Sequence, residues 1–153
     1  MKPGKHHIEI LARGVCIMKG QLLLCQTRGA ANTYLPGGHV EFREQARKAL
    51  EREIAEEMGY RAKAGRFLGC VEHVFPQKGR WHAEINLMFE LRIPGLTPAT
   101  PPPSCEEWIE FCWVPLNKLR SAHLEPSVLV KELPEWLRRS AGFCGTAGGW
   151  SEK

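Results

Sequence analysis

Three glutamates close together in one predicted helix are the residues of this chain best suited to chemistry. The segment 44–58 consists largely of strong helix formers, and at about 100° per residue Glu53, Glu56 and Glu57 fall within one arc of the helix surface. That arc also contains Ala49, so the acids adjoin the apolar stripe instead of facing away from it. We therefore expect the three carboxylates to point toward the body of the protein or a cleft in it.

Carboxylates at this spacing repel one another and raise one another's pKa. A bound divalent cation relieves the repulsion, and a ligand set made only of oxygen suits Mg²⁺ or Mn²⁺ better than zinc. Proteins commonly hold substrate phosphates through Mg²⁺ bound by a few carboxylates and several waters. The helix thus indicates metal-assisted phosphoryl chemistry. The alternative is a helix whose acids are tied up in ion pairs with Arg47, Lys48 and Arg52.

The segment from Gly38 to Tyr60 resembles the signature of the Nudix hydrolase family. That signature is Gly-x5-Glu-x7-Arg-Glu-U-x-Glu-Glu-x-Gly-U, where U is a bulky apolar residue, and the segment here is GHVEFREQARKALEREIAEEMGY. Every strictly specified position matches. Tyr60 stands where an aliphatic residue is usual, and Arg43 stands where many members carry glycine. Neither position is a metal-binding carboxylate, so these departures concern only the local shape of the loop.

The resemblance implies a role for each charged residue of this segment. Glu53, Glu56 and Glu57 would bind the divalent metal, and Glu53 is also a candidate base for the attacking water. Arg52 would be a catalytic residue that orients the neighbouring acids through ion pairs. Glu44 would brace the junction between loop and helix, or bind a further metal.

The resemblance also implies a reaction and a fold. The family hydrolyses the diphosphate of a nucleoside diphosphate linked to another moiety, with Mg²⁺ or Mn²⁺ as cofactor. Its fold is an α/β/α sandwich with a mixed β-sheet flanked by helices, of the α/β (α+β) class. Gly37 and Gly38 would let the backbone approach the metal, and the carbonyl of Gly38 would be a ligand. Two alternatives stay open: a non-catalytic nucleotide-binding or regulatory module, and a pyrophosphohydrolase of RNA 5′ ends.

The composition is that of one globular domain. The 153 residues are 43% hydrophobic and 25% charged, which argues against disorder, and we expect a single domain over 1–140 with a flexible tail over 141–153. The net charge of +4 comes without a dense Lys/Arg run, which favours a small anionic partner over nucleic acid. No apolar stretch is long enough to span a bilayer, and the six cysteines lack the paired spacing of zinc ligands. We expect a cytoplasmic protein whose partner is a nucleotide diphosphate; a homodimer is left open.

The elements that position the acids follow from hydrophobic patterning. Alternation over 81–91 places Glu84 and Asn86 on a face polar enough to line a cleft, and pairing with 67–75 would bring His73 opposite His82. The proline-rich stretch 94–104 is a loop. The remaining predicted elements are strands at 7–18, 21–26 and 108–114, a turn at 19–20, and a helix at 126–133 that Pro134 ends or restarts.

Residues outside the glutamate helix would set the choice of substrate. Candidates for substrate binding are Arg28, His39, Glu84 and Glu107. Glu107 follows the proline-rich loop, near a point where many family members place an extra metal ligand or base; a solvated loop acid is the alternative. Pro76 lies 16 residues after Tyr60, a spacing that resembles the marker of ADP-ribose pyrophosphatases, although proline is also an ordinary turn residue.

Overall fold

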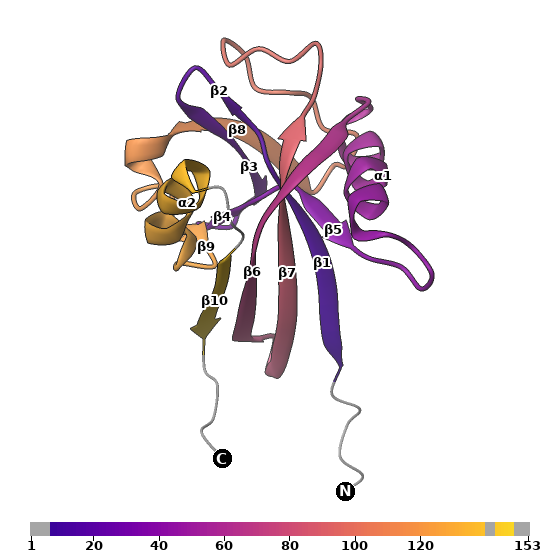
Figure 1. The fold of residues 1–153 in the computed structure, drawn as a ribbon, viewed down its shortest axis with the longest axis vertical. Coiled ribbons are helices and arrows are strands. Elements are labelled where there is room, and N and C mark those ends of the chain that lie inside the picture. The colour runs from indigo at the N-terminus through magenta and orange to yellow at the C-terminus, as the bar shows by residue number, and fades with distance from the viewer. Residues whose placement is uncertain (1–6, 140–142, 149–153) are drawn as a thin grey trace, which may run out of the picture.

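Two β-sheets lie between two helices in the computed structural model, which describes residues 7–139 and 143–148 (Figure 1). The first sheet has the strand order β10-β6-β7-β1-β5 and is mixed, because β1 runs parallel to β7 but antiparallel to β5. Its strands are β1 (Ile8–Val15), β5 (Gly37–His39), β6 (Lys63–Gln77), β7 (Arg80–Arg92) and β10 (Phe143–Gly148). This arrangement confirms the predicted α/β/α sandwich.

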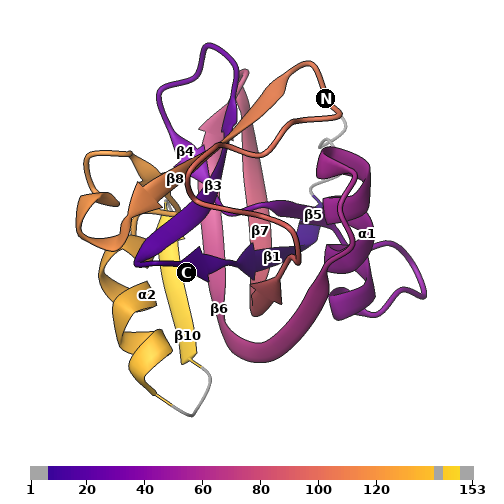
Figure 2. The ribbon, with the colours of Figure 1, turned by 90° about the horizontal axis from the view of Figure 1, so that it is seen from above.

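The second sheet packs against the first. Its order is β2-β3-β4-β9, and β8 pairs with the other edge of β3. The strands are β2 (Ile17–Met18), β3 (Gln21–Thr27), β4 (Thr33–Tyr34), β8 (Ile109–Pro115) and β9 (Leu124–Glu125). The helices are α1 (Ala46–Met58) and α2 (Leu129–Arg138), with a short 3-10 turn over Leu116–Lys118. Seen from above, α1 and α2 lie on opposite sides of the strands (Figure 2).

Strand β3 divides the hydrophobic core into two halves. Alternate residues of a strand point to opposite faces, so Leu23 and Cys25 pack in the half that also holds α1. Leu22 and Leu24 pack in the half that holds α2. All four side chains are fully buried. The run of apolar residues in this short strand is therefore explained by burial on both faces.

Helix α1 has the apolar face that the sequence predicts. Ala49, Leu50 and Ile54 are fully buried, and Gly59 ends the helix in the left-handed conformation with φ of 73°. The helix begins at Ala46, two residues later than predicted, and no side chain caps its first turn. The carboxylate of Glu44 instead accepts a hydrogen bond from the backbone N–H of Glu41, three residues earlier in the loop.

The prediction for the second helix was wrong in both bounds. Residues 126–128 form turns that precede α2, and the helix continues through Pro134 to Arg138. A proline inside a helix forfeits one backbone hydrogen bond. Here Leu129, Leu133 and Trp136 are buried on one side of α2, and this burial outweighs the missing bond.

Part of the predicted tail is a strand. Residues 143–148 pair in parallel with β6, from Phe143 opposite Gly69 to Gly148 opposite Val74. The rest of the tail lies outside the described residues, and the domain boundary near residue 140 stays a prediction. No helix within the described part of the chain is long and apolar enough to cross a membrane.

The β6–β7 hairpin corrects the predicted pairing of two histidines. Its turn is formed by Lys78 and Gly79, both with positive φ, and its register places His73 opposite Glu84. His82 lies opposite Phe75 and stacks on it, with ring centroids 5.4 Å apart. Both strands extend beyond the predicted bounds, and the polar face of β7 reaches the region between the two sheets.

Candidate active site

Two glycines bring the β5 backbone against helix α1. Gly37 has φ of 126°, and a Cβ there would lie 2.1 Å from the carbonyl oxygen of Ala12 on the neighbouring strand. A Cβ at Gly38 would lie 2.5 Å from the carboxyl carbon of Glu53. Any larger residue would have to displace a backbone atom or this carboxylate. The glycines therefore allow a close approach between the Gly38 backbone and Glu53.

Arg52 connects the loop to the glutamates of α1. Its Nε and Nη2 donate to the two oxygens of Glu44 at 2.9 and 3.0 Å, a bidentate pair. Its Nη1 donates to Glu53 Oε1 at 3.0 Å and to Glu56 Oε2 at 3.1 Å. Its Nη2 also donates to the backbone carbonyl of His39. One guanidinium thus fixes three carboxylates and the end of β5, and its hydrogen bond to Glu44 lowers the pKa of that carboxyl to about 2.

Glu57 is the buried acid of the group. Only 8% of the residue is exposed, and Oε2 has no hydrogen-bond partner among the described residues. Burial raises the pKa of Glu57 to about 7; the positive charge of Arg13 opposes this effect, and Glu53 and Glu106 add to it. A buried carboxylate with an unpartnered oxygen is costly unless a cation or donor compensates it.

The other two glutamates differ in exposure. The side chain of Glu53 is 18% exposed and that of Glu56 is 54% exposed, so the three acids form a gradient from the core to the solvent. Within residues 7–139, no three His, Cys, Asp or Glu side chains converge closely enough to enclose a metal ion by themselves. Arg52 holds Glu53 and Glu56 in their present places.

The donor set nevertheless fits a hard divalent cation. Every candidate ligand is an oxygen, the kind that Mg²⁺ and Mn²⁺ prefer. The unpartnered Glu57 Oε2 is a buried acceptor, and the absence of a side chain at Gly38 lets the Glu53 carboxylate lie against the β5 backbone. Carboxylates of α1 and the Gly38 carbonyl could together supply several ligands and leave further positions to water and phosphate.

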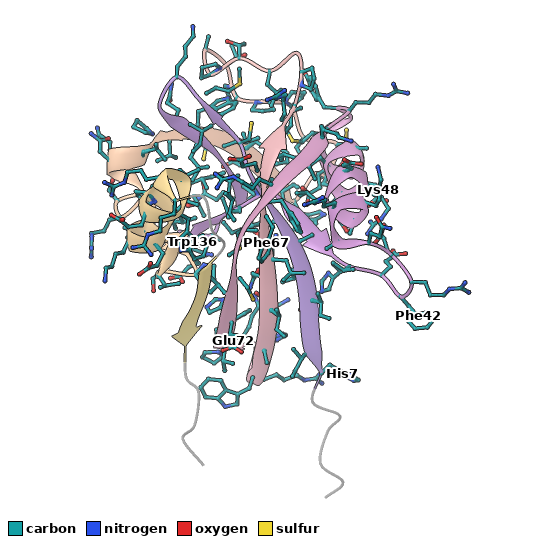
Figure 3. All side chains as sticks on the ribbon, in the orientation of Figure 1. His7, Phe42, Lys48, Phe67, Glu72 and Trp136 are labelled. Carbon is teal, nitrogen blue, oxygen red and sulfur yellow. The ribbon has the colours of Figure 1, made fainter. Side chains whose placement is uncertain are left out.

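The loop before α1 has a strained residue. Arg43 has φ of 67°, in the left-handed region that favours glycine. This is one of the two positions where the sequence departs from the signature described above, the other being Tyr60. The neighbouring Phe42 is 95% exposed and points away from the body of the protein, as does Lys48 on the outer face of α1 (Figure 3).

A cavity of about 500 Å³ lies between the two sheets, and its lining comes from the strands, their loops and the start of α2, with no residue of α1. Arg13 lines it and connects it to the α1 region, because its Nη1 donates to the carbonyls of Leu35 and Gly37 at 3.2 and 3.0 Å. Asn86 and Glu84 of β7 also line it, as does Pro76 of β6. The polar face of β7 thus borders a cavity, as its alternation predicts.

The four candidate substrate residues lie in different places. Glu84 lines the cavity. Arg28 is exposed just beyond its edge, next to the lining residue Thr27. His39 is exposed, and its ring lies 3.2 Å from Glu9 Oε2. Glu107 is exposed, and the structure does not bring it to the glutamates of α1. The negative charge of the adjacent Glu106, instead, contributes to the raised pKa of Glu57.

Two residues of the site are absent from the predicted set of site residues. From the sequence, Arg13 is one of four arginines that are possible phosphate contacts, with nothing to favour it over the others, and Asn86 is one member of the polar face of its strand. The structure shows that Asn86 is 2% exposed and that its Oδ1 lies 3.4 Å from the Nε of Arg13. The available signal was weak, because β1 and β7 contain other polar residues besides Arg13 and Asn86.

Comparison with known proteins places this geometry in context. The sequence model of one family, described as NUDIX domain, matches residues 6–138. Among similar solved structures, a MutT protein from Methanosarcina mazei has a TM-score of 0.67 at 24% identity, covering 88% of this chain and 96% of that one. An ADP-ribose pyrophosphatase from Streptococcus suis has a TM-score of 0.61 at 14% identity, covering 90% and 98%. A UDP-X diphosphatase has a TM-score of 0.59 at 19% identity, covering 93% and 69%.

Proposed function

Because this chain belongs to the NUDIX domain family and is a pyrophosphohydrolase of that family, we propose that it cleaves the diphosphate of a nucleoside diphosphate linked to another moiety, with Mg²⁺ as its cofactor. One observation carries the proposal. The Glu53 carboxylate lies against the Gly38 backbone, and Glu57 on the same helix adds a buried oxygen without a partner among the described residues. A buried carboxylate oxygen without a partner is costly in free energy, and a bound divalent cation would remove that cost.

The metal ligands in this proposal are Glu53, Glu56, Glu57 and the carbonyl of Gly38, with Mn²⁺ as the alternative to Mg²⁺. When bound, the cation neutralises phosphate oxygens and lowers the pKa of water. The fit rests on the all-oxygen donor set and on the close approach of the Glu53 carboxylate to the Gly38 backbone.

The chain's own residues supply the rest of the reaction. Glu53 accepts the proton of the attacking water, whose oxygen forms a bond to one phosphorus while the bridging P–O bond breaks. Arg52 positions Glu53 through Nη1 and is itself anchored by the bidentate pair with Glu44. Glu44 keeps its negative charge across the working pH range, since its pKa is lowered to about 2. Such positioning dominates phosphoryl transfer, where little covalent work is left to the protein.

An ADP-ribose-like nucleotide is the substrate we propose to test first. Two of the structurally similar proteins have names that specify ADP-ribose and UDP-X, which supports a diphosphate joined to a second group. Pro76 borders the cavity, which supports a role at the substrate as well as in the hairpin. Small nucleotides are the partners this proposal requires, and the cytoplasm is the compartment we propose.

The test is product release from a panel of diphosphates. The panel holds ADP-ribose, nucleoside triphosphates, dinucleoside polyphosphates, nucleotide sugars and capped RNA, each assayed with Mg²⁺, with Mn²⁺ and with a chelator. We expect cleavage of one class, abolished by the chelator and restored by added metal. Equal cleavage with and without chelator would contradict the metal requirement, and cleavage of capped RNA alone would replace the small-nucleotide substrate.

A further inference from the structure

The cavity between the sheets has a size and a lining that suit one planar ring system. Its volume of about 500 Å³ is within the range of small-molecule sites. Most of its wall is apolar or aromatic and comes from both sheets and the start of α2: Tyr34, Leu35, Phe75, Met88, Pro126 and Leu129. A sugar carries hydroxyls all around its ring and would leave many of them unpaired against such a wall. A nucleobase, with two apolar faces and polar groups only at its edge, fits better.

Three polar side chains of the lining, Arg13, Asn86 and Glu84, form an ordered chain, and His73 adjoins its end. Arg13 can only donate, so the atom of Asn86 that faces its Nε at 3.4 Å is Oδ1. The amide nitrogen of Asn86 therefore points the other way and donates to Glu84 Oε2 at 3.2 Å. His73 Nδ1 lies 3.8 Å from the same oxygen of Glu84.

Glu84 is thus held by one oxygen and keeps the other for a ligand. Both protein neighbours act on Oε2, and Oε1 has no hydrogen-bond or ion-pair partner within the described ranges. The side chain is only 14% exposed and lines the cavity. Burial on its own would raise the pKa of Glu84, but the nearby His73 imidazole, the hydrogen bond from Asn86 and the charge of Arg13 lower it overall. Glu84 is therefore ionised at neutral pH and can only accept hydrogen bonds.

Resting on the proposed function, we propose that this cavity binds the nucleobase of the substrate and that Glu84 Oε1 selects a base with an exocyclic amino group. Such a base donates an N–H to the carboxylate. A base with a carbonyl at the same place would set two acceptors against each other. Glu84 is then the specificity-determining residue, with Asn86 and His73 positioning it.

The first test compares nucleotides that differ at one group. ADP-ribose and its hypoxanthine counterpart differ in an amino group replaced by a carbonyl, and CDP- and UDP-linked sugars differ in the same way. We expect kcat/KM to be about 10- to 100-fold higher for the amino-bearing member of the pair that is turned over. Equal kcat/KM for both members would overturn the proposal. This comparison uses the unmodified protein, so it does not depend on the folding of a variant.

The second test is Glu84→Gln. Because the Asn86 nitrogen is a donor, the carbonyl of the new amide would turn toward it and the NH₂ group would face the cavity. The variant therefore converts the selecting acceptor into a donor, and we expect the preference to reverse toward the carbonyl-bearing base. Glu90→Gln, the same change on the same strand beside Arg66, should leave the preference as it is. An unchanged preference in a folded Glu84→Gln protein would contradict the proposal.

Binding without turnover separates this proposal from the proposed function. Calorimetric titration with AMP and with IMP measures the base preference even if no diphosphate is cleaved. Tighter binding of AMP by about 10-fold, reversed in Glu84→Gln, would support the base site even if the panel shows no turnover. Turnover of diphosphates together with equal affinity for AMP and IMP would keep the function and remove the base site. Reversal by Glu125→Gln and not by Glu84→Gln would assign the selection to the other carboxylate of the lining and overturn the proposal.

Discussion

The Cα of Gly38 faces the carboxylate of Glu53 so closely that an added Cβ would lie 2.5 Å from its Cδ and 2.6 Å from its Oε2. The strand β5 and the helix α1 thereby pack closely at Gly38, as they also do at the neighbouring Gly37, where a Cβ would lie 3.0 Å from Leu50 Cδ1. The contact at Gly38, more than the helix alone, determines where the Glu53 carboxylate lies.

The first prediction concerns Gly38→Ala. The methyl group would displace the Glu53 carboxylate, and a displacement of about 1 Å at a reacting group can reduce the rate about 100-fold. We expect kcat to fall by at least about that factor, measured in steady-state assays. Gly65→Ala is the matched control, since its Cβ would meet Glu90 only at an ordinary 3.5 Å. Near-normal kcat in Gly38→Ala would show that this contact is not needed.

The second prediction concerns the free energy of unfolding of Glu57→Gln in the absence of metal. Burial raises the folded-state pKa of Glu57 to about 7, so the folded protein binds more protons than the unfolded chain between pH 4.5 and 7. Glu57 therefore destabilises the fold as the pH rises through this window. We expect Glu57→Gln to be more stable than the unmodified protein by about 1–3 kcal/mol at pH 8, with the difference vanishing near pH 4.5.

Denaturant melts at several pH values with a chelator present measure this difference. Glu56→Gln is the control, because its side chain is 54% exposed and should change stability little. A Glu57→Gln protein less stable than the unmodified one at pH 8 would contradict the account of this buried acid.

The third prediction concerns Arg52→Lys. A lysine cannot make the bidentate bond to Glu44 and reach Glu53 at the same time, because its ammonium is a single point charge. We expect kcat/KM to fall about 10- to 100-fold, the usual effect of losing a residue that orients metal ligands. Arg66→Lys, at an arginine that bonds Glu90 away from the site, should be close to normal. Full activity of Arg52→Lys would mean that positive charge alone suffices.

The fourth prediction concerns the loop residue Arg43. Its φ of 67° is strained for any residue with a Cβ, so Arg43→Gly should raise the free energy of unfolding by about 0.5–1 kcal/mol. Arg43→Ala removes the same side chain but keeps the Cβ, and should give no such gain. Chemical denaturation of the unmodified protein and the two variants measures these free energies of unfolding. Equal gains in Arg43→Gly and Arg43→Ala would mean that the stabilisation comes from removing the charge and not from relieving backbone strain.

The glutamate helix was predictable because its signal is local. Helix formers, the apolar face and a glycine at the C-terminal end all occur within one short segment, and Gly59 ends α1 as expected. The turn at Lys19 and Gly20 was predictable for the same reason, because its residues are neighbours in the sequence. The single strand predicted over 7–18 was wrong, since β1 belongs to the first sheet and only β2 pairs with β3 across the turn.

The second helix and the paired strands were harder because tertiary contacts decide them. Pro134 favours ending a helix, yet burial of Leu133 and Trp136 carries α2 past it. The segment 143–148 has little strand signal, and its pairing with β6 depends on a partner more than seventy residues earlier. Local propensity contains no information about either contact.

The cavity chain of Arg13, Asn86 and Glu84 shows the same limit. Alternation placed Glu84 and Asn86 on one face, but it could not show that Arg13 lies beside them. Arg13 and Met88 are register partners across β1 and β7, and only this pairing brings the arginine next to Asn86. For the same reason His73 was assigned the wrong partner, since the register of the hairpin was not known.

The central claim is that the carboxylates of α1 catalyse metal-dependent hydrolysis of a diphosphate. The most direct test measures the hydrolysis of ADP-ribose by ³¹P NMR in the presence of Mg²⁺. It compares the unmodified protein with a Glu53→Gln variant that is shown to be folded. We predict signals of AMP and ribose 5-phosphate from the unmodified protein, and a rate about 100- to 1,000-fold lower from the variant. Equal rates for the two proteins would contradict the claim.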